Sequence, residues 1–118
     1  MTATASHTFD WPRPPLTANQ RLHYMAKARI TRDVRTAAAY AFRNFPEVEK
    51  VRVELEWVVT TSHRRDVDNI VPTLKAVCDG LVDVEIVPDD TPQYMEKVMP
   101  TIRRGEKAGV IVRVSEIP

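Results

Sequence analysis

The segment Val51-Arg-Val-Glu-Leu-Glu-Trp-Val-Val59 carries the clearest structural signal in the chain. Its apolar side chains alternate with mostly charged ones, and successive side chains of a strand point to opposite faces of the sheet. We therefore expect a strand with one face in a hydrophobic core and the other face toward solvent.

A helix is expected downstream, from about Asn69 to Val82. Pro72 fits there only because the first turn of a helix leaves its N–H groups without partners. One stripe of the helix is apolar, and the opposite side is polar. The apolar stripe consists of Ile70, Val71, Leu74, Val77, Cys78 and Leu81, and the polar side of Asp68, Pro72, Lys75 and Asp79.

Upstream of the strand, the sequence predicts a helix from Thr31, as N-cap, through Arg43. Apolar residues recur there at helical spacing, and Asn44-Phe45-Pro46 ends the pattern. Before it, residues 8–12 resemble a short strand. The proline-rich run 12–15 cannot be helical and is expected to lie extended over the surface.

The last third of the chain is expected to be mostly strand. Residues 94–102 and 109–116 predict a hairpin around Arg103 to Ala108, with Val110, Val112 and Val114 on one face. Before them, the short apolar segment 84–87 leads to a turn at Pro88. Residues 1–118 are therefore predicted to form a single α+β domain, with a small mixed or antiparallel sheet of about four strands and two helices.

Net charge is close to neutral, with 17 basic and 16 acidic residues, so it does not by itself indicate a nucleic-acid-binding protein. The distribution is more informative, because seven basic residues fall between Arg13 and Arg43 with Asp33 as the only acid. Such a basic region could hold a polyanion near the acids at 66–90. It could equally be a solvated helix face.

Several classes of protein are not expected. No apolar run approaches the roughly 20 residues that span a bilayer, and the first residues do not resemble a secretory signal. Cys78 is the only cysteine, so an intrachain disulfide is impossible, as suits a reducing cytoplasm. The sequence also lacks a phosphate-binding glycine loop, zinc-ligand spacing, an EF-hand and a nucleophilic serine motif.

The run Arg64-Arg-Asp-Val-Asp-Asn69 carries the strongest chemical signal. If the chain is still extended there, Asp66 and Asp68 point to the same side, roughly 6 to 7 Å apart. A divalent cation would relieve the repulsion between two such carboxylates, and magnesium prefers hard oxygen ligands. Asp90, in preference to Asp89, is the expected third ligand. Alternatively, Asp68 or Asn69 simply caps the helix.

Three motifs in order resemble the RusA family of crossover-junction endodeoxyribonucleases. They are Arg65-Asp-Val-Asp-Asn69, Lys75-Ala-Val-Cys-Asp79-Gly-Leu81 and Pro88-Asp-Asp-Thr-Pro92. The resemblance implies a homodimer that binds four-way DNA junctions and makes paired, symmetric nicks with magnesium, for which manganese would substitute. It also implies Asp66, Asp68 and Asp90 as metal ligands and Lys75 as the essential lysine.

Two features depart from the family pattern. Lys75 lies farther from Asn69 than in the best-studied members, about 10 Å beyond Asp68 along a helix axis. Either the helix begins late and brings Lys75 near the metal, or Lys75 pairs with Asp79 at i+4. In addition, Val84-Glu85 stands where a glycine often ends the helix.

The resemblance thus predicts a magnesium-dependent endonuclease that resolves Holliday junctions in DNA recombination and repair, in the cytoplasm of a bacterium or of a cell carrying a phage. The basic residues expected to contact the DNA backbone are Arg64, Arg65, Lys27, Arg29 and Arg32. Two alternatives remain open: a broader nuclease acting on flaps or forks, and an inert junction-binding protein. Trp11 and Trp57 are expected in the core, and His23 and Tyr24 either pack or stack on unpaired bases.

Overall fold

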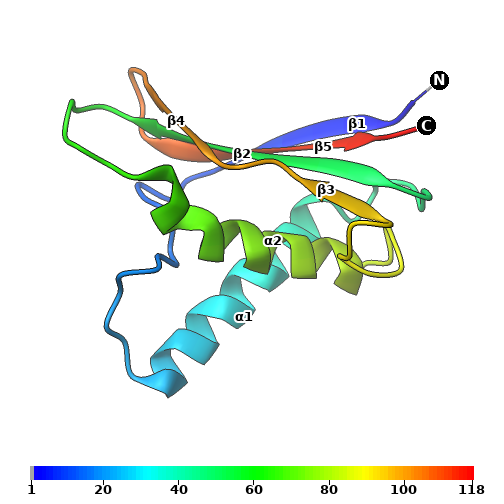
Figure 1. Cartoon of the computed structure of the whole chain (residues 1–118), viewed down its shortest axis with the longest axis horizontal. Helices are drawn as coiled ribbons and strands as arrows, with labels where there is room; N and C mark the ends of the chain where they lie inside the picture. Colours follow the sequence, from blue (N-terminus) through cyan, green and yellow to red (C-terminus); the bar gives the residue numbers. More distant parts are fainter. Residues whose placement is uncertain (1) are drawn as a thin grey trace.

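The computed structural model describes residues 2–118. Within this range the chain forms two α-helices and a five-stranded mixed sheet, which confirms the predicted α+β class. Both helices lie on one face of the sheet (Figure 1). The elements in chain order are β1 (Thr4–Phe9), α1 (Tyr24–Ala41), β2 (Val51–Val59), the 3₁₀ helix η1 (Val67–Ile70), α2 (Val71–Asp83), β3 (Met95–Lys97), β4 (Thr101–Arg104) and β5 (Gly109–Glu116).

Strand β2 is the centre of the sheet. It pairs antiparallel with β5 on one side, and β5 in turn pairs antiparallel with the edge strand β1. On its other side, β2 pairs parallel with β3 and then with β4. The connection from β2 to β3 runs through α2, so this helix is a crossover that packs back onto the sheet.

The core lies between the sheet and the helices. The alternation predicted for β2 is confirmed, because Val51, Val53 and Leu55 are buried while Arg52 is exposed. Val110, Val112 and Val114 of β5 are buried on the same face, as predicted. The apolar stripe of α2 is also confirmed, apart from a half-buried Val71: its buried members are Ile70, Leu74, Val77, Cys78 and Leu81.

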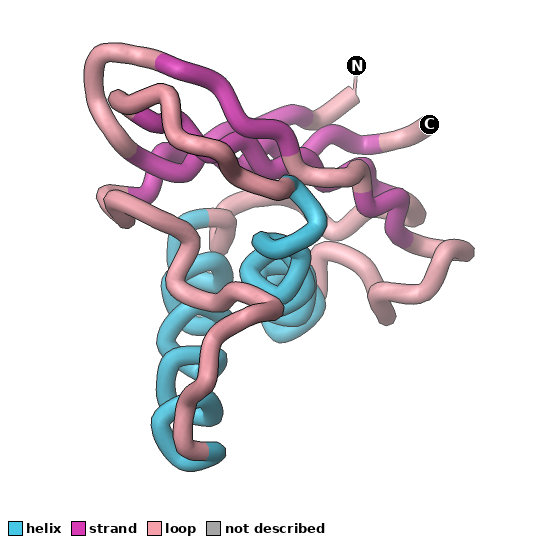
Figure 2. Tube along the Cα trace, turned by 60° about the vertical axis from the view of Figure 1, so that its left-hand side comes forward, coloured by secondary structure: helices cyan, strands magenta, loops and turns pink. Residues whose placement is uncertain are grey.

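Helix α1 is much less buried than α2. Only Val34 and Ala38 of the helix are buried, and its N-terminal end extends away from the sheet (Figure 2). The two helices approach closely where they meet, because a Cβ at Gly80 would lie 2.4 Å from the carbonyl oxygen of Arg35. Arg35 also donates two hydrogen bonds to Asp83 of α2, at 3.0 and 2.7 Å.

The predicted hairpin between residues 94–102 and 109–116 is wrong. β4 and β5 lie on opposite sides of β2, and the turn between them crosses the end of that strand. Gly105 makes this crossing possible, because its N–H donates to Val59 at 2.8 Å and a Cβ there would lie 2.7 Å from Val58. The long strand β2 offers pairing groups on both sides, which accommodates both segments.

The predicted start of the first helix is also wrong. The helix begins at Tyr24 rather than after Thr31, and the ring Nδ1 of His23 caps it by accepting from the N–H of Met25 at 3.2 Å. Thr31 lies inside the helix, where its hydroxyl donates to the carbonyl of Lys27. The extra turns are largely exposed and show no apolar stripe.

The first strand also differs from expectation, because it covers Thr4–Phe9 rather than residues 8–12. The short apolar segment 84–87 ends α2 in a Schellman motif, in which Ile86 donates to Leu81 and Glu85 to Val82. Glu85 occupies the left-handed position, with φ of 61°, that glycine usually takes. Among residues 2–118, no helix has the length and apolar character to cross a membrane.

Candidate functional site

Asp66 and Asp68 lie between the end of β2 and the start of α2. Asp66 is extended, with φ −107° and ψ 127°, whereas Asp68 already belongs to η1. The side chain of Asp66 caps neither helix, and α2 begins after Ile70, so neither Asp68 nor Asn69 is its N-cap. The capping alternative for these two residues is therefore wrong.

Both aspartates line one groove with a volume of ≈ 800 Å³. It lies between the proline-rich segment that follows β1 and the loop that leads into η1. Both carboxylates are exposed, and within residues 2–118 neither makes an ion pair. The groove is lined by Arg13, Pro14, Thr17, Ala18, Asn19, Gln20, Trp57, Arg64, Arg65, Asp66, Asp68, Asn69 and Ile70.

The proline-rich run and the residues that follow it form one wall of the groove, and residues 16–19 tie this wall to the helices at two points. Asn69 accepts from Ala18 N–H through its backbone oxygen at 2.8 Å and from Asn19 N–H through its side chain at 3.1 Å. Deeper in the fold, the buried hydroxyl of Thr73 accepts from Leu16 N–H and donates to Leu16 O. The extended segment predicted from the prolines is thus held in place rather than loosely draped.

Three arginines line the groove, and they differ in whether neighbouring residues hold their guanidinium groups. Arg65 is held by the loop, because its guanidinium donates to Thr61 and His63 and lies over the Trp57 ring at 5.2 Å. Arg13 and Arg64 make no hydrogen bond or ion pair with other described side chains. Their charges are therefore available to an anion that enters the groove.

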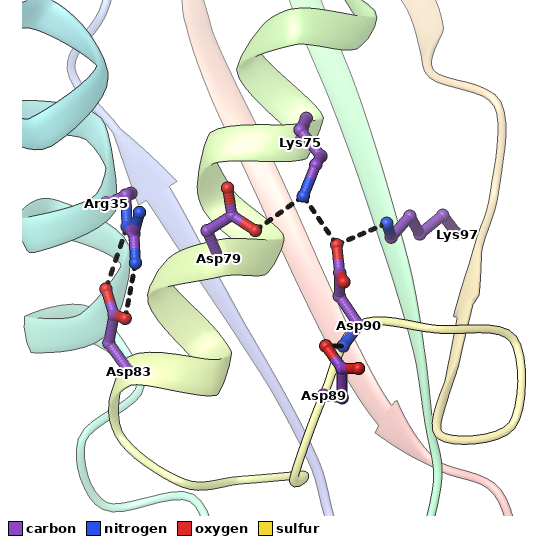
Figure 3. Close-up of polar contacts among 7 residues, drawn as sticks. All are labelled: Arg35, Lys75, Asp79, Asp83, Asp89, Asp90 and Lys97. Atoms are coloured by element: carbon purple, nitrogen blue, oxygen red, sulfur yellow. Dashed lines mark hydrogen bonds and ion pairs between the residues drawn. The ribbon is translucent and has the colours of Figure 1, made fainter. Parts of the chain in front are cut away.

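Asp90 lies in a different setting, between two lysines (Figure 3). Its Oδ2 accepts from Lys75 of α2 at 2.7 Å and from Lys97 of β3 at 2.8 Å. Lys75 also donates to Asp79 at 2.8 Å, so the i+4 alternative for this lysine is confirmed. Asp89 behaves as a turn residue, because its Oδ1 accepts from the N–H of Asp90.

The lysine–aspartate cluster shifts the titration of its members. Hydrogen bonds from Lys75 and then Lys97 hold the pKa of Asp90 well below its ordinary value, against a smaller opposing effect of burial. The hydrogen bonds of Lys75 to Asp79 and then to Asp90 raise the pKa of Lys75. Both groups are therefore charged across the neutral range. Burial raises the pKa of the Cys78 thiol to about 12, which suits an inert core residue rather than a nucleophile.

The structure therefore brings together part of the predicted site. Asp66 and Asp68 share a groove with Arg64 and Arg65, whereas Asp90 is held in the lysine cluster. Nowhere in residues 2–118 do three His, Cys, Asp or Glu side chains gather closely enough to hold a metal ion. Sequence reasoning missed Lys97, whose short strand carries no motif. It counted Arg13 in the basic region before Arg43 but did not name it among the residues that contact DNA.

The other predicted DNA-binding residues lie on α1. Lys27, Arg29 and Arg32 are all exposed and none lines the aspartate groove. Lys27 and Arg32 face one shallow hollow beside Arg35. His23 and Tyr24 are exposed, Tyr24 by 74%, and their rings lie against each other at 4.5 Å rather than in the core. Trp11 and Trp57 are half-buried against the core, as predicted.

Comparisons of the sequence with known proteins do not assign the chain to a family. No protein-family model matches the chain, and no curated protein matches it. The likeness to the RusA family therefore rests on the three sequence motifs alone.

Proposed function

We propose that the chain is a magnesium-dependent endonuclease of the RusA type, which resolves four-way DNA junctions by paired phosphodiester hydrolysis during recombination and repair. A homodimer acting in a bacterial or phage-infected cytoplasm belongs to the same proposal. The observation that carries it is the groove, in which two carboxylates without ion-pair partners lie among three arginines. This combination suits metal-assisted hydrolysis of a phosphodiester, because the arginines attract the phosphate and the carboxylates can hold a cation beside it.

The donor set of the groove fits magnesium in part. Asp66 and Asp68 offer exposed, hard oxygen atoms, and magnesium commonly takes one or two carboxylates while water and substrate phosphate complete its shell. Asp90 fits only after its Oδ2 has left the two lysines that hold it. When bound, the cation would lower the pKa of a water and neutralise charge on the phosphate.

The basic side chains have separate roles in this proposal. Arg13 and Arg64 bind the phosphate that enters the groove, and Arg65 orders the loop that carries Asp66. Lys75 spends two of its three N–H donors on Asp79 and Asp90, which leaves one for a phosphate oxygen. Lys27, Arg29 and Arg32 hold a second stretch of backbone along α1.

A second candidate is a junction-binding protein without activity. The observation that favours it is the engagement of Asp90 by Lys75 and Lys97, which leaves two free carboxylates rather than three. A third candidate, a nuclease that also cuts flaps and forks, would use the same groove.

A cleavage assay separates these candidates. End-labelled four-way junctions, flaps and forks are incubated with the purified chain in magnesium and in chelator. We expect symmetric nicks in the junction with magnesium and none with chelator. Junction binding without nicks under both conditions would favour the inert protein, and equal cutting of all three substrates would favour the broader nuclease.

A further inference from the structure

The first turn of α1 and the residue before His23 carry large apolar side chains that the fold leaves in solvent. Tyr24 is 74% exposed, Met25 62% and Leu22 39%. This end of the helix stands away from the sheet (Figure 2). Single exposed apolar side chains are ordinary, but three within four residues form a patch, and such a patch commonly marks a contact surface.

The ring of Tyr24 is held in position by His23. The two ring centroids are 4.5 Å apart, and the ring planes are inclined by 33°. His23 is itself fixed, because its Nδ1 accepts from the N–H of Met25 at 3.2 Å. A side chain that is ordered before a ligand arrives loses less entropy on binding. Tyr24 therefore offers a flat, exposed surface in a defined position.

Tyr24 also lines a hollow of ≈ 580 Å³ beside α1. Lys27 and Arg32 line the same hollow, since they follow Tyr24 by about one and two helical turns and lie on the same side of the helix. Between them the lining includes the small residues Ala28 and Thr31. The hollow thus combines an aromatic ring, two cationic side chains and room for a flat group.

The hollow carries a net positive charge. Within residues 2–118, neither Lys27 nor Arg32 makes an ion pair. The acid that lines the hollow, Asp83, accepts two hydrogen bonds from Arg35, so this pair adds no net charge. Single-stranded nucleic acid is recognised by this combination, in which bases stack on aromatic rings and cations neutralise the backbone.

We propose that the hollow binds an unpaired DNA base, which stacks on Tyr24 while Lys27 and Arg32 hold the adjoining phosphates. The inference rests on the proposed function and names the feature of the substrate that α1 recognises. Strands exchange partners at the branch point of a junction, and a base there leaves its stack at lower cost than a base inside a duplex arm.

The hollow and the aspartate groove lie near the two ends of one segment. Residues 17–20 line the groove, and three residues separate Gln20 from Tyr24. An extended chain spans at most about 3.6 Å per residue, so Gln20 and Tyr24 lie within about 14 Å of each other. A base stacked on Tyr24 therefore belongs to a nucleotide close to the phosphate in the groove.

A lipid surface is the other partner that an exposed apolar end could contact. A helix that lies in a membrane interface needs an apolar face along its length. Between Met25 and Tyr40, α1 has no large apolar side chain that is exposed, and its exposed residues there include Lys27, Arg29 and Arg32. This arrangement favours a nucleic acid.

Two four-way junctions test the proposal by fluorescence anisotropy in chelator, so that no DNA is cut. They differ only in one extra, unpaired thymine at the branch point. The native chain and Tyr24→Phe should bind the junction with the extra thymine more tightly. Tyr24→Ala should lose this preference, and its affinity for that junction should fall about 5- to 150-fold, because the stacking ring is gone. Tyr40→Ala removes a similarly exposed ring at the other end of α1 and should bind like the native chain.

Equal binding of the two junctions by the native chain, or a preference that persists in Tyr24→Ala, would overturn the proposal. So would binding to vesicles of anionic lipid that Tyr24→Ala loses while its DNA binding is unchanged. If Tyr24→Ala does not fold, photocrosslinking of the native chain decides. A 5-iodouracil in place of the extra thymine should attach to Tyr24, and attachment only to other residues contradicts the stacking.

The magnesium-dependent cutting assay gives an independent result. A chain that prefers the extra thymine but does not cut in magnesium would retain the base-binding hollow and lose the proposed nuclease activity. A chain that cuts but shows no preference would retain the nuclease activity and lose the hollow.

Discussion

The ammonium Nζ of Lys97 lies 2.8 Å from Oδ2 of Asp90, and this contact links β3 to the loop that follows α2. Asp90 is well shielded there, with 19% of its side chain exposed. Because Lys75 donates to the same oxygen, the carboxylate that the motif marks as a metal ligand has two cationic partners within the fold. The carboxylate of Asp90 is therefore expected to contribute first to the stability of the folded chain.

Asp90→Asn should lower the free energy of unfolding at pH 7 by about 0.5 to 2 kcal/mol, the range for two partly exposed ion pairs. The folded-state pKa of Asp90 is depressed, so its contribution is complete above the unfolded value of about 3.9 and is lost as the pH falls through the folded value. Urea unfolding at several pH values should show the difference between the native chain and the variant shrinking below about pH 4. Asp33→Asn, at an exposed helix position, is the control. Equal stability of Asp90→Asn and the native chain at pH 7 would contradict the lysine contacts.

Glu85→Gly should raise the free energy of unfolding by about 0.5 to 1 kcal/mol. A side chain in the left-handed region costs about 1 to 2 kcal/mol, and the greater freedom of glycine in the unfolded chain cancels part of the gain. Val84→Gly is the matched control, because Val84 has φ −98° and should lose stability on the same change. A loss of stability in Glu85→Gly would mean that the Schellman turn is wrongly placed.

The elements that sequence reasoning located are those with one buried face. The alternation of β2 and the apolar stripe of α2 both arise because one face of each element packs against the core. Apolar residues therefore recur in the sequence at the period of a strand or of a helix. The first turns of α1 and the edge strand β1 are mostly exposed, so their sequences carry no such period. The pairing of β4 with β2 could not be predicted from the sequence, because the tertiary structure determines which strands form hydrogen bonds with each other. The short distance in sequence between β4 and β5 favoured a hairpin instead.

The candidate site likewise contains residues whose placement the sequence predicted and residues whose placement it did not. Asp66 and Asp68 are close in sequence, so their placement in one groove was predictable from the motif. The distance from either residue to Asp90 depends on where α2 ends and how its loop returns, which the motif does not encode. Lys97 could be found only from the fold, because β3 brings it beside a loop that precedes it by several residues.

The basic residues on α1 should set the salt dependence of DNA binding. Replacing Lys27, Arg29 and Arg32 together with glutamine should reduce the slope of log K against log salt by about 0.9 for each phosphate that the variant no longer neutralises. Fluorescence anisotropy of a labelled junction at several salt concentrations measures the slope. Arg113→Gln, on the sheet face away from the helices, should leave it unchanged. An unchanged slope in the triple variant would remove α1 from the DNA-binding surface.

Manganese should bind first at the groove. Because Mn²⁺ is paramagnetic and accepts the same hard ligands as magnesium, NMR signals of residues 66–69 should broaden at the lowest concentrations. Asp66→Asn should weaken this broadening, whereas Lys97→Met should extend it toward Asp90 by removing one competing partner. Broadening that begins at residues 89–90 in the native chain would place the cation in the lysine cluster instead.

The most direct test of the nuclease proposal is the rate at which Asp68→Asn cuts a four-way junction in magnesium. We predict a fall of at least about 100-fold relative to the native chain, since the replaced carboxylate holds the cation, while junction affinity stays within about twofold and Asp33→Asn cuts normally. Undiminished cutting by Asp68→Asn would contradict the assignment of the groove as the site of hydrolysis.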